Sequence, residues 1–455
     1  MADLLSLLNL GAAGLSAQHA GASVASNNAA NVNTAGYSRQ RLDLSAELAA
    51  PLVGGVRTGN PDRYQDLLLA SRERDAAGSL GSASAQAPAL LDLEARIDGA
   101  GESVDARIAG LWAGLERVAA MPTDSLLRNA AIAAAKNLAD GIRERAAAIA
   151  SARADADARI RDHSDQASHL AGELATLNTQ IKQSPDPVLR DRRDLAAKQL
   201  AELVGGAGRV DPDGQLRYVL PDGGVLVDGA RAAKLVATPD PTTGLRKVEL
   251  VDGNSRRDET ATLTGGKLGG ELSFRDGAAA TAATDLDQLA FDLTGAFNAV
   301  HQANAGTDGV TGRVMFTPLT TATGAAAVIA VDPALISDPT RLATAAPGTG
   351  PGDNTGALAL LGLRDQTLAA GGTQTLSDAA IDLIGNIGRG AHDAQAEVDR
   401  ATVVSDHLGD LRDALSGVDL DEEMSNLVRF QHGAEAMTRF ISTIDGMLGD
   451  LLNRL

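Results

Sequence analysis

The sequence predicts a multidomain, mainly α-helical protein with a β-rich insertion. Near both chain ends, apolar residues recur at alternating spacings of three and four, which is typical of a coiled-coil helix. Long stretches between the ends keep a helical period, but the period changes to two between about Arg209 and Phe274. A chain of 455 residues can form roughly two to four domains. We therefore expect terminal coiled-coil helices, an antiparallel helical bundle and one β-rich region.

Residues 1–60 are expected to form the N-terminal helix and loop of an inner domain. Asn31, Asn33, Thr34 and Gly36 form a turn-forming cluster at the end of the helical pattern. Glycines and prolines then predict a loop, at Pro51, Gly54, Gly55, Gly59 and Pro61. The seam of this helix contains Leu4, Leu8, Gly11, Leu15, Gln18, Ala22, Ala25, Ala29 and Val32. Its side chains become smaller along the helix, from leucine to glycine and alanine, so a partner helix can approach closely.

Residues 61–205 are expected to form a helical bundle. The helical pattern runs from about Leu90 to Val204, with a break at Met121–Pro122 and a stop at Ser184–Pro187. A last helix, Asp191 to Leu203, is stopped by Gly205 and Gly206. One apolar stripe of this bundle contains Ile97, Ile108, Leu111, Leu115 and Val118. Trp112 lies inside that stripe and is predicted to be a core residue.

Residues 206–280 are expected to form β-hairpins. Turn signals at Asp213–Gly214, Asp222–Gly223 and Asp252–Gly253 separate segments in which apolar residues alternate. These alternating residues are Leu216, Tyr218, Leu220, Val225, Val227, Val248 and Leu250. We expect a helix returning to the bundle over 281–305, an irregular mixed segment over 306–375, and another bundle helix over 376–415.

Residues 416–455 carry the strongest pattern in the chain, which predicts the C-terminal coiled-coil helix of the inner domain. Its seam is Leu427, Phe430, Ala434, Met437, Ile441, Ile444, Leu448, Leu451 and Leu455. Asp419, Glu422 and Glu423 stand where this helix should begin, so they can cap its amides and complement its positive end. The partner of each terminal seam is either the other terminal seam or a copy from a neighbouring subunit.

The composition points away from several classes of function. The formal net charge of −19 argues against binding to nucleic acid or to an anionic membrane, which both require basic surface. The absence of cysteine excludes disulfides, thiolate metal sites and cysteine nucleophiles. No apolar run is long enough to cross a bilayer, so we expect no membrane insertion. Because Met1 to Leu10 does not resemble a secretory signal, a protein outside the cell would need another export route.

No catalytic, cofactor-binding or metal-binding residues are predicted, and no cofactor is expected. The histidines show no HExxH spacing and are expected to be mostly solvated helix-face residues. Glycine pairs lack the context of a phosphate-binding loop and are interpreted as turns; they are Gly205–Gly206, Gly265–Gly266 and Gly269–Gly270. The acidic run Asp419 to Glu423 lacks the glycine and ligand spacing of a calcium-binding loop, so helix capping is the favoured interpretation.

One motif near the N-terminus resembles a known family. The stretch Ser26-Asn27-Asn28-Ala29-Ala30-Asn31-Val32-Asn33-Thr34-Ala35-Gly36-Tyr37 is similar to the N-terminal signature of flagellar rod, hook and hook-associated axial proteins. The family pattern usually has a larger aliphatic residue at Ala29 and a proline at Ala35. Further segments are similar to the hook-associated branch of this family, namely Tyr37–Gln40, Asp191–Leu195, Gly269–Arg275, Ser416–Met424 and Ile441–Asp445.

The resemblance implies a subunit of a tube, with paired terminal helices on the inner wall. It implies an extracellular location in the bacterial flagellum, at the hook-filament junction, after a transient cytoplasmic stage and unfolded passage through the flagellar type III export channel. The implied partners are copies of the chain itself, the hook protein, the next junction protein (FlgL-like) and an export chaperone at the C-terminal helix. The implied function is a structural adaptor, not an enzyme, that filament assembly and motility require.

The predicted assembly interface combines the two seams with the motif. On the N-terminal side it contains Leu4, Leu8, Leu15, Asn27, Asn28, Asn31, Asn33, Gly36 and Tyr37. On the C-terminal side it contains Leu427, Phe430, Met437, Ile441, Ile444, Leu448 and Leu451. Two alternatives stay open: a different axial protein of the hook or distal rod, and an enzyme carried on a flagellar scaffold. A hydrolase site in Gly306 to Gly372 would need a nucleophile and base, and no recognisable pair is present.

Overall fold

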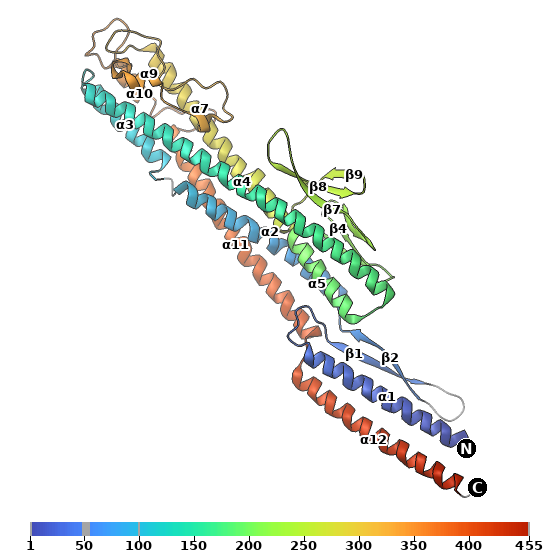
Figure 1. Cartoon of the computed structure of the whole chain (residues 1–455). Helices are drawn as coiled ribbons and strands as arrows, with labels where there is room; N and C mark the ends of the chain where they lie inside the picture. Colours follow the sequence, from blue (N-terminus) through green and yellow to red (C-terminus); the bar gives the residue numbers. More distant parts are fainter. Residues whose placement is uncertain (1, 48–54, 99–100, 454–455) are drawn as a thin grey trace.

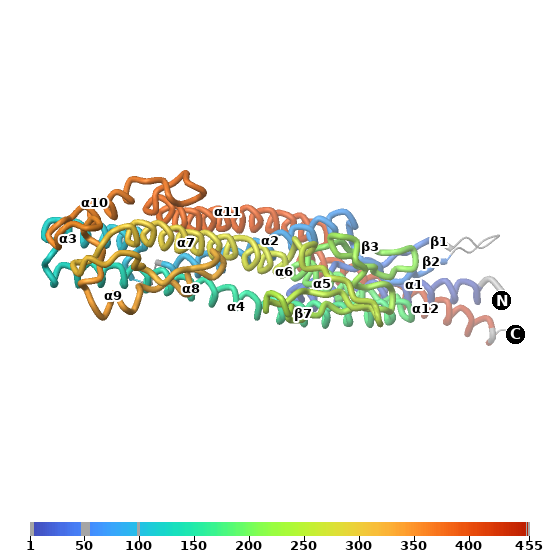
Figure 2. The backbone as a smooth tube through the Cα atoms, turned by 90° about the horizontal axis from the view of Figure 1, so that it is seen from above, coloured from blue at the N-terminus to red at the C-terminus, as the bar shows by residue number. Residues whose placement is uncertain are grey.

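The computed structural model, which describes residues 2–47, 55–98 and 101–453, is an elongated, mainly helical molecule (Figure 1). Long helices run along most of its length, and three small antiparallel sheets lie beside them. The two chain ends lie together at one end, and the irregular segment lies at the opposite end (Figure 2). The predicted fold class, mainly α with a β-rich insertion, is confirmed.

The end that carries both termini is built from two helices and a hairpin. Helix α1 (Ala2–Ala30) runs beside α12 (Leu420–Leu452), and strands β1 (Gln40–Glu47) and β2 (Gly55–Arg63) pair antiparallel next to α1. We call this unit the terminal unit. The prediction of a loop after the first helix was wrong, because residues 40–63 contain a hairpin. The irregular register between Leu42 and Leu44 interrupts the alternation that would have indicated a strand. The predicted turn residues Pro51 and Gly54, and seam residue Leu455, lie outside the described residues.

The bundle contains α2 (Leu67–Asp98), α3 (Val104–Ala120), α4 (Ser125–Gln183), α5 (Pro187–Val204) and α11 (Leu376–Ser416). The predicted helix stops are confirmed, since α3 ends at Ala120, α4 ends at Gln183 and Gly205 follows the end of α5. Asp124 and Asp186 begin α4 and α5 as N-caps that accept hydrogen bonds from backbone amides, so α5 begins at Pro187 and not at the predicted Asp191. Helix α2 starts well before the predicted Leu90, because its first half is rich in serine and glycine and carries little apolar pattern. Trp112 is buried, as predicted, and stacks on Phe297 with 5.3 Å between ring centroids.

The β-rich region forms two antiparallel sheets that pack on α4. One sheet contains β3 (Ala207–Val210), β4 (Leu216–Val219), β5 (Val225–Asp228) and β6 (Arg231–Ala232). The other contains β7 (Lys234–Pro239), β8 (Arg246–Asp252) and β9 (Ser255–Asp258). All three predicted Asp-Gly hairpin turns are confirmed, since they join β3 to β4, β4 to β5 and β8 to β9.

The chain becomes helical again earlier than predicted. Helix α6 (Gly266–Leu272) continues through a π-helical turn, η1 (Ser273–Ala278), into α7 (Ala279–Ala303). The interpretation of Gly269–Gly270 as a turn was wrong, because both residues lie inside α6. A Cβ atom on Gly270 would lie 2.2 Å from the carbonyl oxygen of Ser82, so α6 can cross α2 only where a glycine stands.

Residues 304–375 form a lobe at the end of the bundle that lies away from the termini. It contains α8 (Ala325–Val328), α9 (Pro333–Ser337), a 3-10 turn, η2 (Pro339–Arg341), and α10 (Thr355–Leu361), with isolated bridges between its loops. These short elements agree with the expected mixed segment. The expectation that histidines lie mostly on solvated helix faces was wrong for His301, which is fully buried where α7 meets this lobe.

The ring of His301 joins two loops of the lobe as a neutral side chain. Its Nδ1 lies 2.8 Å from the carbonyl oxygen of Arg313, and its Nε2 accepts a hydrogen bond of 3.0 Å from the backbone amide of Ala343. The carbonyl requires the hydrogen on Nδ1, so Nε2 is the free acceptor. Burial is the main cause that lowers the pKa of His301, and the charges of Arg128 and Arg313 act in the same direction.

A lowered pKa makes the contribution of His301 to stability depend on pH. The contribution is complete above the unfolded-state pKa of about 6.5 and is lost as pH falls below it, because the unfolded chain then binds a proton that the folded chain refuses. We expect His301→Gln to lower the Tm at pH 7.5, and the difference from the parent protein to shrink as pH falls toward 5.5. Thermal unfolding of both proteins between pH 7.5 and pH 5.5 measures this difference in Tm, and the exposed His392→Gln variant is the control. A difference that stays constant with pH would contradict the prediction.

Candidate assembly site

Helices α1 and α12 meet along a line of glycines on α1. A Cβ atom on Gly11 would lie 2.8 Å from Ile441, and one on Gly21 would lie 2.4 Å from Phe430. Between them, a Cβ on Gly14 would lie 3.0 Å from the sulfur of Met437. The partner numbers fall as the α1 numbers rise, so the helices are antiparallel. Glycine lets the backbone of α1 approach the large α12 side chains closely.

The predicted seams differ in how closely they match this contact. On α12, Ile444 is buried, Leu427, Phe430, Met437, Ile441 and Leu448 are half-buried, and Leu451 is exposed. On α1, the fully buried positions are Gly11, Gly14, Ala17, Gly21, Ala25 and Asn28, whereas Leu4, Leu8 and Leu15 are only half-buried. Gly11 and Ala25 belong to the seam that we predicted on α1, whereas Gly14, Ala17, Gly21 and Asn28 each lie one residue before a predicted seam position. The glycine spacing was the better signal, because large residues on α12 need small residues opposite them.

Asn28 fixes the turn that leads from α1 into the hairpin. Its side-chain amide donates a 2.9 Å hydrogen bond to the carbonyl oxygen of Gln40, and its Oδ1 accepts from the amide of Gln40 at 2.9 Å and from the Tyr37 hydroxyl at 2.8 Å. The side chain is 1% exposed, so these bonds form away from water. Burial, and then the charges of Asp191 and Glu423, raise the pKa of Tyr37 to about 12, so its hydroxyl keeps the hydrogen that it donates.

The other motif residues complete the turn. Asn31 donates from its side chain to the backbone and side-chain oxygens of Asn27, and its own Oδ1 accepts from Thr34. Gly36 has a φ of +78° and sits against the side chain of Leu195, where a Cβ would lie 3.3 Å away. Asn33 is exposed. The predicted motif residues with buried or half-buried structural contacts are therefore Asn28, Asn31, Gly36 and Tyr37, whereas Asn27 and Asn33 are exposed.

Arg39 joins the N-terminal segment to the beginning of α12. Its guanidinium contacts Glu422 at 2.6 Å and Glu423 at 2.7 Å, and Glu423 is buried. Its backbone amide donates to the carbonyl oxygen of Ser416, the last residue of α11. Asp419 caps α12 by accepting from the amides of Asp421 and Glu422, which confirms the predicted N-cap. The acidic run thus both caps the helix and pairs with an arginine.

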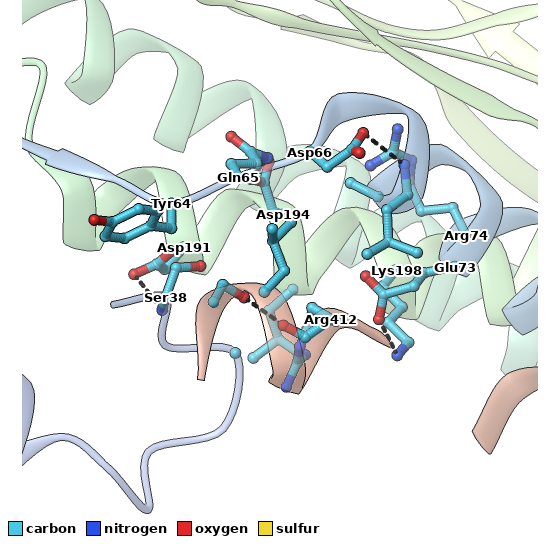
Figure 3. Close-up of a pocket in the computed structure, with 16 residues that line it drawn as sticks. Ser38, Tyr64, Gln65, Asp66, Glu73, Arg74, Asp191, Asp194, Lys198 and Arg412 are labelled. Atoms are coloured by element: carbon cyan, nitrogen blue, oxygen red, sulfur yellow. Dashed lines mark hydrogen bonds and ion pairs between the residues drawn. The ribbon is translucent and has the colours of Figure 1, made fainter. Parts of the chain in front are cut away.

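A second ion-pair cluster attaches the terminal unit to the bundle. Arg63, at the end of β2, contacts Asp191 at 2.8 Å and Asp194 at 3.0 Å on α5. Asp191 also accepts a hydrogen bond from the amide of Ser38. Figure 3 shows Ser38, Tyr64, Asp191 and Asp194 lining one pocket at this joint, together with Arg412 of α11. Burial raises the pKa of Asp191 despite the opposing effect of Arg63, so the ion pair is held in a site of low polarity.

The described residues show no group of three or more His, Asp or Glu that could hold a metal ion. Within the same residues, no helix is both long and apolar enough to cross a membrane. The geometry at the joined termini is therefore one of contact surfaces, caps and ion pairs. Such an arrangement can hold two chain ends together and present them to other molecules.

The chain is similar to known flagellar proteins. Residues 90–316 match the family model of the flagellar hook-associated protein FlgK helical domain, and residues 414–455 match that of the flagellar basal body rod FlgEFG protein C-terminal region. The flagellar hook-associated protein 1 of Bacillus subtilis (strain 168) is 26% identical over 96% of this chain and 96% of its own. That of Escherichia coli (strain K12) is 25% identical over 98% of this chain and 99% of its own. The chain belongs to the FlgK family.

The fold agrees with this assignment. The solved structure of the flagellar hook junction protein FlgK from Burkholderia pseudomallei superimposes with a TM-score of 0.69, at 16% identity, over 76% of this chain and 100% of that chain. The resemblance that we predicted from the Asn28 motif and from the segments around Asp191 and Glu423 is thereby confirmed. The FlgK family is a family of structural flagellar proteins.

The predicted site omitted the charged residues of the joint, namely Arg39, Arg63, Asp191 and Asp194. Arg39 and Asp191 stand in segments that already resembled the FlgK family, so that likeness was the available signal. Nothing in the local pattern showed that Arg63 would reach Asp191, which lies 128 positions away in sequence. A contact between residues so distant becomes visible only once the chain has folded.

Replacing Asn28 is expected to loosen the hairpin of this FlgK family member without unfolding its bundle. In Asn28→Ala, the amide and carbonyl of Gln40 and the Tyr37 hydroxyl lose their buried partner, at a cost of about 2–3 kcal/mol. Hydrogen exchange should then accelerate in residues 40–47 and 55–63 and stay unchanged in α3 and α4. Exposed Asn33→Ala is the matched control. Equal exchange in both variants would show that Asn28 does not hold the hairpin.

Proposed function

We propose that this chain is a structural adaptor at the hook-filament junction of the bacterial flagellum. The observation that carries the proposal is that α1 and α12, the helices at the two chain ends, form an antiparallel pair. The surface of this pair that faces away from the helix contact still carries apolar side chains. Phe440, Met447 and Leu451 on α12 and Leu5 on α1 are exposed although both helices are already paired. Exposed apolar surface of this extent on a helix pair is typical of a subunit interface. Neighbouring copies in a tube would cover it.

Similarity to the FlgK family supports the further steps of the proposal. The chain passes unfolded through the flagellar type III export apparatus, after a cytoplasmic stage in which an export chaperone holds its C-terminal helix. Outside the cell it polymerises through α1 and α12, contacts the hook protein on one side and the next junction protein (FlgL-like) on the other, and is required for filament growth and motility. A structural role without catalysis is proposed, in agreement with the relatives.

Electron microscopy of a strain that lacks the gene tests this proposal, together with an assay for flagellin in the medium. We expect hooks without filaments, and flagellin lost to the medium. Filaments should return with the parent gene and not with Ile441→Asp or Leu448→Asp, because each places a charge in the half-buried seam of α12. Ser442→Asp, on an exposed position of the same helix, should restore filaments. Normal filaments in the deletion strain would refute the adaptor role.

A second candidate is a different axial protein, of the hook or distal rod. It is favoured by one observation, the match of residues 414–455 to a family model named for rod proteins. The same micrographs distinguish the two candidates. Loss of the hook itself in the deletion strain would favour the hook or rod assignment over the junction.

A further inference from the structure

The half of α11 nearest α12 carries an apolar stripe beside its contact with α2. Val404, Leu408, Leu411 and Leu415 follow one another at spacings of four, three and four, the pattern of a coiled-coil seam. The stripe borders the contact of α11 with α2, because buried Ala401 precedes Val404 by three positions and Leu415 lines the same pocket as Leu69 of α2. Val404, Leu411 and Leu415 are between 45% and 52% exposed, which is unusual for a regular seam. We call these four residues the α11 stripe.

The beginning of α12 carries a matching stripe. Leu420, Met424 and Val428 are spaced by four residues and are between 47% and 53% exposed. They stand on a different face from Phe430, Met437 and Ile441, which face α1, because consecutive residues of a helix are turned by about 100°. We call Leu420, Met424 and Val428 the α12 stripe. Pairing of α12 with α1 therefore leaves the α12 stripe available.

Only Gly417, Val418 and Asp419 separate the two helices, a length that suits a hairpin of two antiparallel helices. If α12 folded back at this turn, Leu415 would lie opposite Leu420, and Leu411 would lie opposite Met424. In the same register Val404 would face Gln431.

Charge complementarity continues that register beyond the apolar stripes. Arg400 on α11 would lie opposite Glu435 on α12, and both side chains are exposed. One turn further, Glu397 would lie near Arg439. Opposite charges at the edge of an apolar seam favour one alignment of two helices over others. Two exposed residues of each stripe, Leu411 and Leu415 on α11 and Met424 and Leu420 on α12, therefore match in this register, and the charges that follow continue it.

We infer that the α11 stripe is a second docking face for α12, so that α12 can either pair with α1 or fold back on α11. In the extended arrangement the two helices follow one another end to end (Figure 1). The contacts that hold this arrangement are the pairs of Arg39 with Glu422 and Glu423 and the hydrogen bond from the Arg39 amide to Ser416. Folding back breaks the two ion pairs and removes α12 from Gly11, Gly14 and Gly21.

The folded-back state has a consequence for assembly that rests on the proposed function. A chain whose α12 lies on α11 cannot form the α1–α12 pair, and so it cannot enter a tube through that pair. Leu411, Leu415, Leu420 and Met424 are covered in the same state, which reduces a surface through which unassembled copies would otherwise associate. Arg39 then sets the balance between the two states.

Disulfide trapping in the full-length protein tests the inference directly, because the chain contains no cysteine of its own. The double variant Leu411→Cys, Met424→Cys places thiols opposite one another only in the folded-back state. In the extended arrangement the turn separates them by roughly 15 Å along the helices, beyond the reach of a disulfide. We expect mild oxidation to give an intramolecular disulfide, seen as loss of free thiol in a monomeric band.

The matched control is Asp410→Cys, Met424→Cys, since Asp410 stands at almost the same height of α11 but is turned by about 100° away from the α11 stripe. The disulfide yield should be at least several-fold higher with Leu411→Cys than with this control. Adding Arg39→Gln should raise it further, because the extended arrangement loses its ion pairs. Circular dichroism verifies that all variants keep their helices.

Two results would overturn the inference. Equal or absent intramolecular disulfide in the two pairs would show that α12 does not visit α11. Disulfide-linked dimers would assign the α11 stripe to a second copy of the chain instead. Neither result would affect the proposed junction role, which depends on the filaments of the deletion strain and not on this disulfide.

Discussion

Replacing Gly21 with leucine is expected to separate α1 from α12 and abolish motility. A Cβ atom at this position would already lie 2.4 Å from the ring of Phe430, and leucine adds three further carbon atoms. The cost of overpacking is about 1–3 kcal/mol, and the pair has few other buried side chains to offset it. Amide exchange in both terminal helices should accelerate by about tenfold or more, since 1.4 kcal/mol is a factor of ten.

A compensating change makes this prediction specific. In the double variant Gly21→Leu, Phe430→Ala, the larger side chain on α1 meets a smaller one on α12, so we expect slow exchange and part of the motility to return. Ser16→Leu, on an exposed position of α1, should behave like the parent protein. If Gly21→Leu assembled normally, the line of glycines would not be the contact that holds the two helices.

The same glycines show how far the sequence could predict the terminal unit. The predicted α12 seam is buried or half-buried from Leu427 to Leu448, because large apolar residues at regular spacing indicate one face of a helix, whereas Leu451 is exposed. The face of α1 was predicted correctly at Gly11 and Ala25 and was misplaced by one residue elsewhere, because most of its buried positions are glycines and other small residues that carry little hydrophobic signal. Their importance depends on Phe430 and Met437 opposite them, and that pairing is a tertiary property.

The rest of the fold divides in a similar way. The Asp-Gly turns, the prolines near Ser184 and the glycines Gly205 and Gly206 act locally, so sequence alone placed the hairpins and the C-terminal ends of α4 and α5, whereas α5 begins at Pro187 and not at the predicted Asp191. The start of α2 was missed because its first half carries little apolar pattern. The crossing of α6 over α2 was missed because the close approach at Gly270 makes a glycine favourable inside a helix, where helix propensity argues against it. Arg63 and Asp191 were missed because an ion pair between distant segments leaves no local pattern.

Replacing Arg128 with methionine is expected to have the largest effect on the lobe of residues 304–375. The guanidinium is 2% exposed and donates to Pro122 at 2.7 Å, to Pro339 at 2.8 Å, to Thr344 at 2.9 Å, to Thr340 at 3.2 Å and to Leu342. Four of these acceptors are backbone carbonyls and one is a hydroxyl. Burial lowers the pKa of Arg128 to about 10, so the side chain is still charged at neutral pH. It holds the loop by distributing one charge over five oxygens.

Methionine fills a similar volume but donates no hydrogen bond, so these oxygens would be buried without a partner. We expect a loss of about 3–5 kcal/mol and a Tm lower by roughly 10 °C. Limited proteolysis should then cut residues 304–375 first, while α5 and the two sheets that pack on α4 stay protected. Arg161→Met, on an exposed position of α4, is the matched control and should change neither quantity. An unchanged Tm in Arg128→Met would mean that the packing around Phe297 and Phe316, and not the buried guanidinium, fixes the lobe on the bundle.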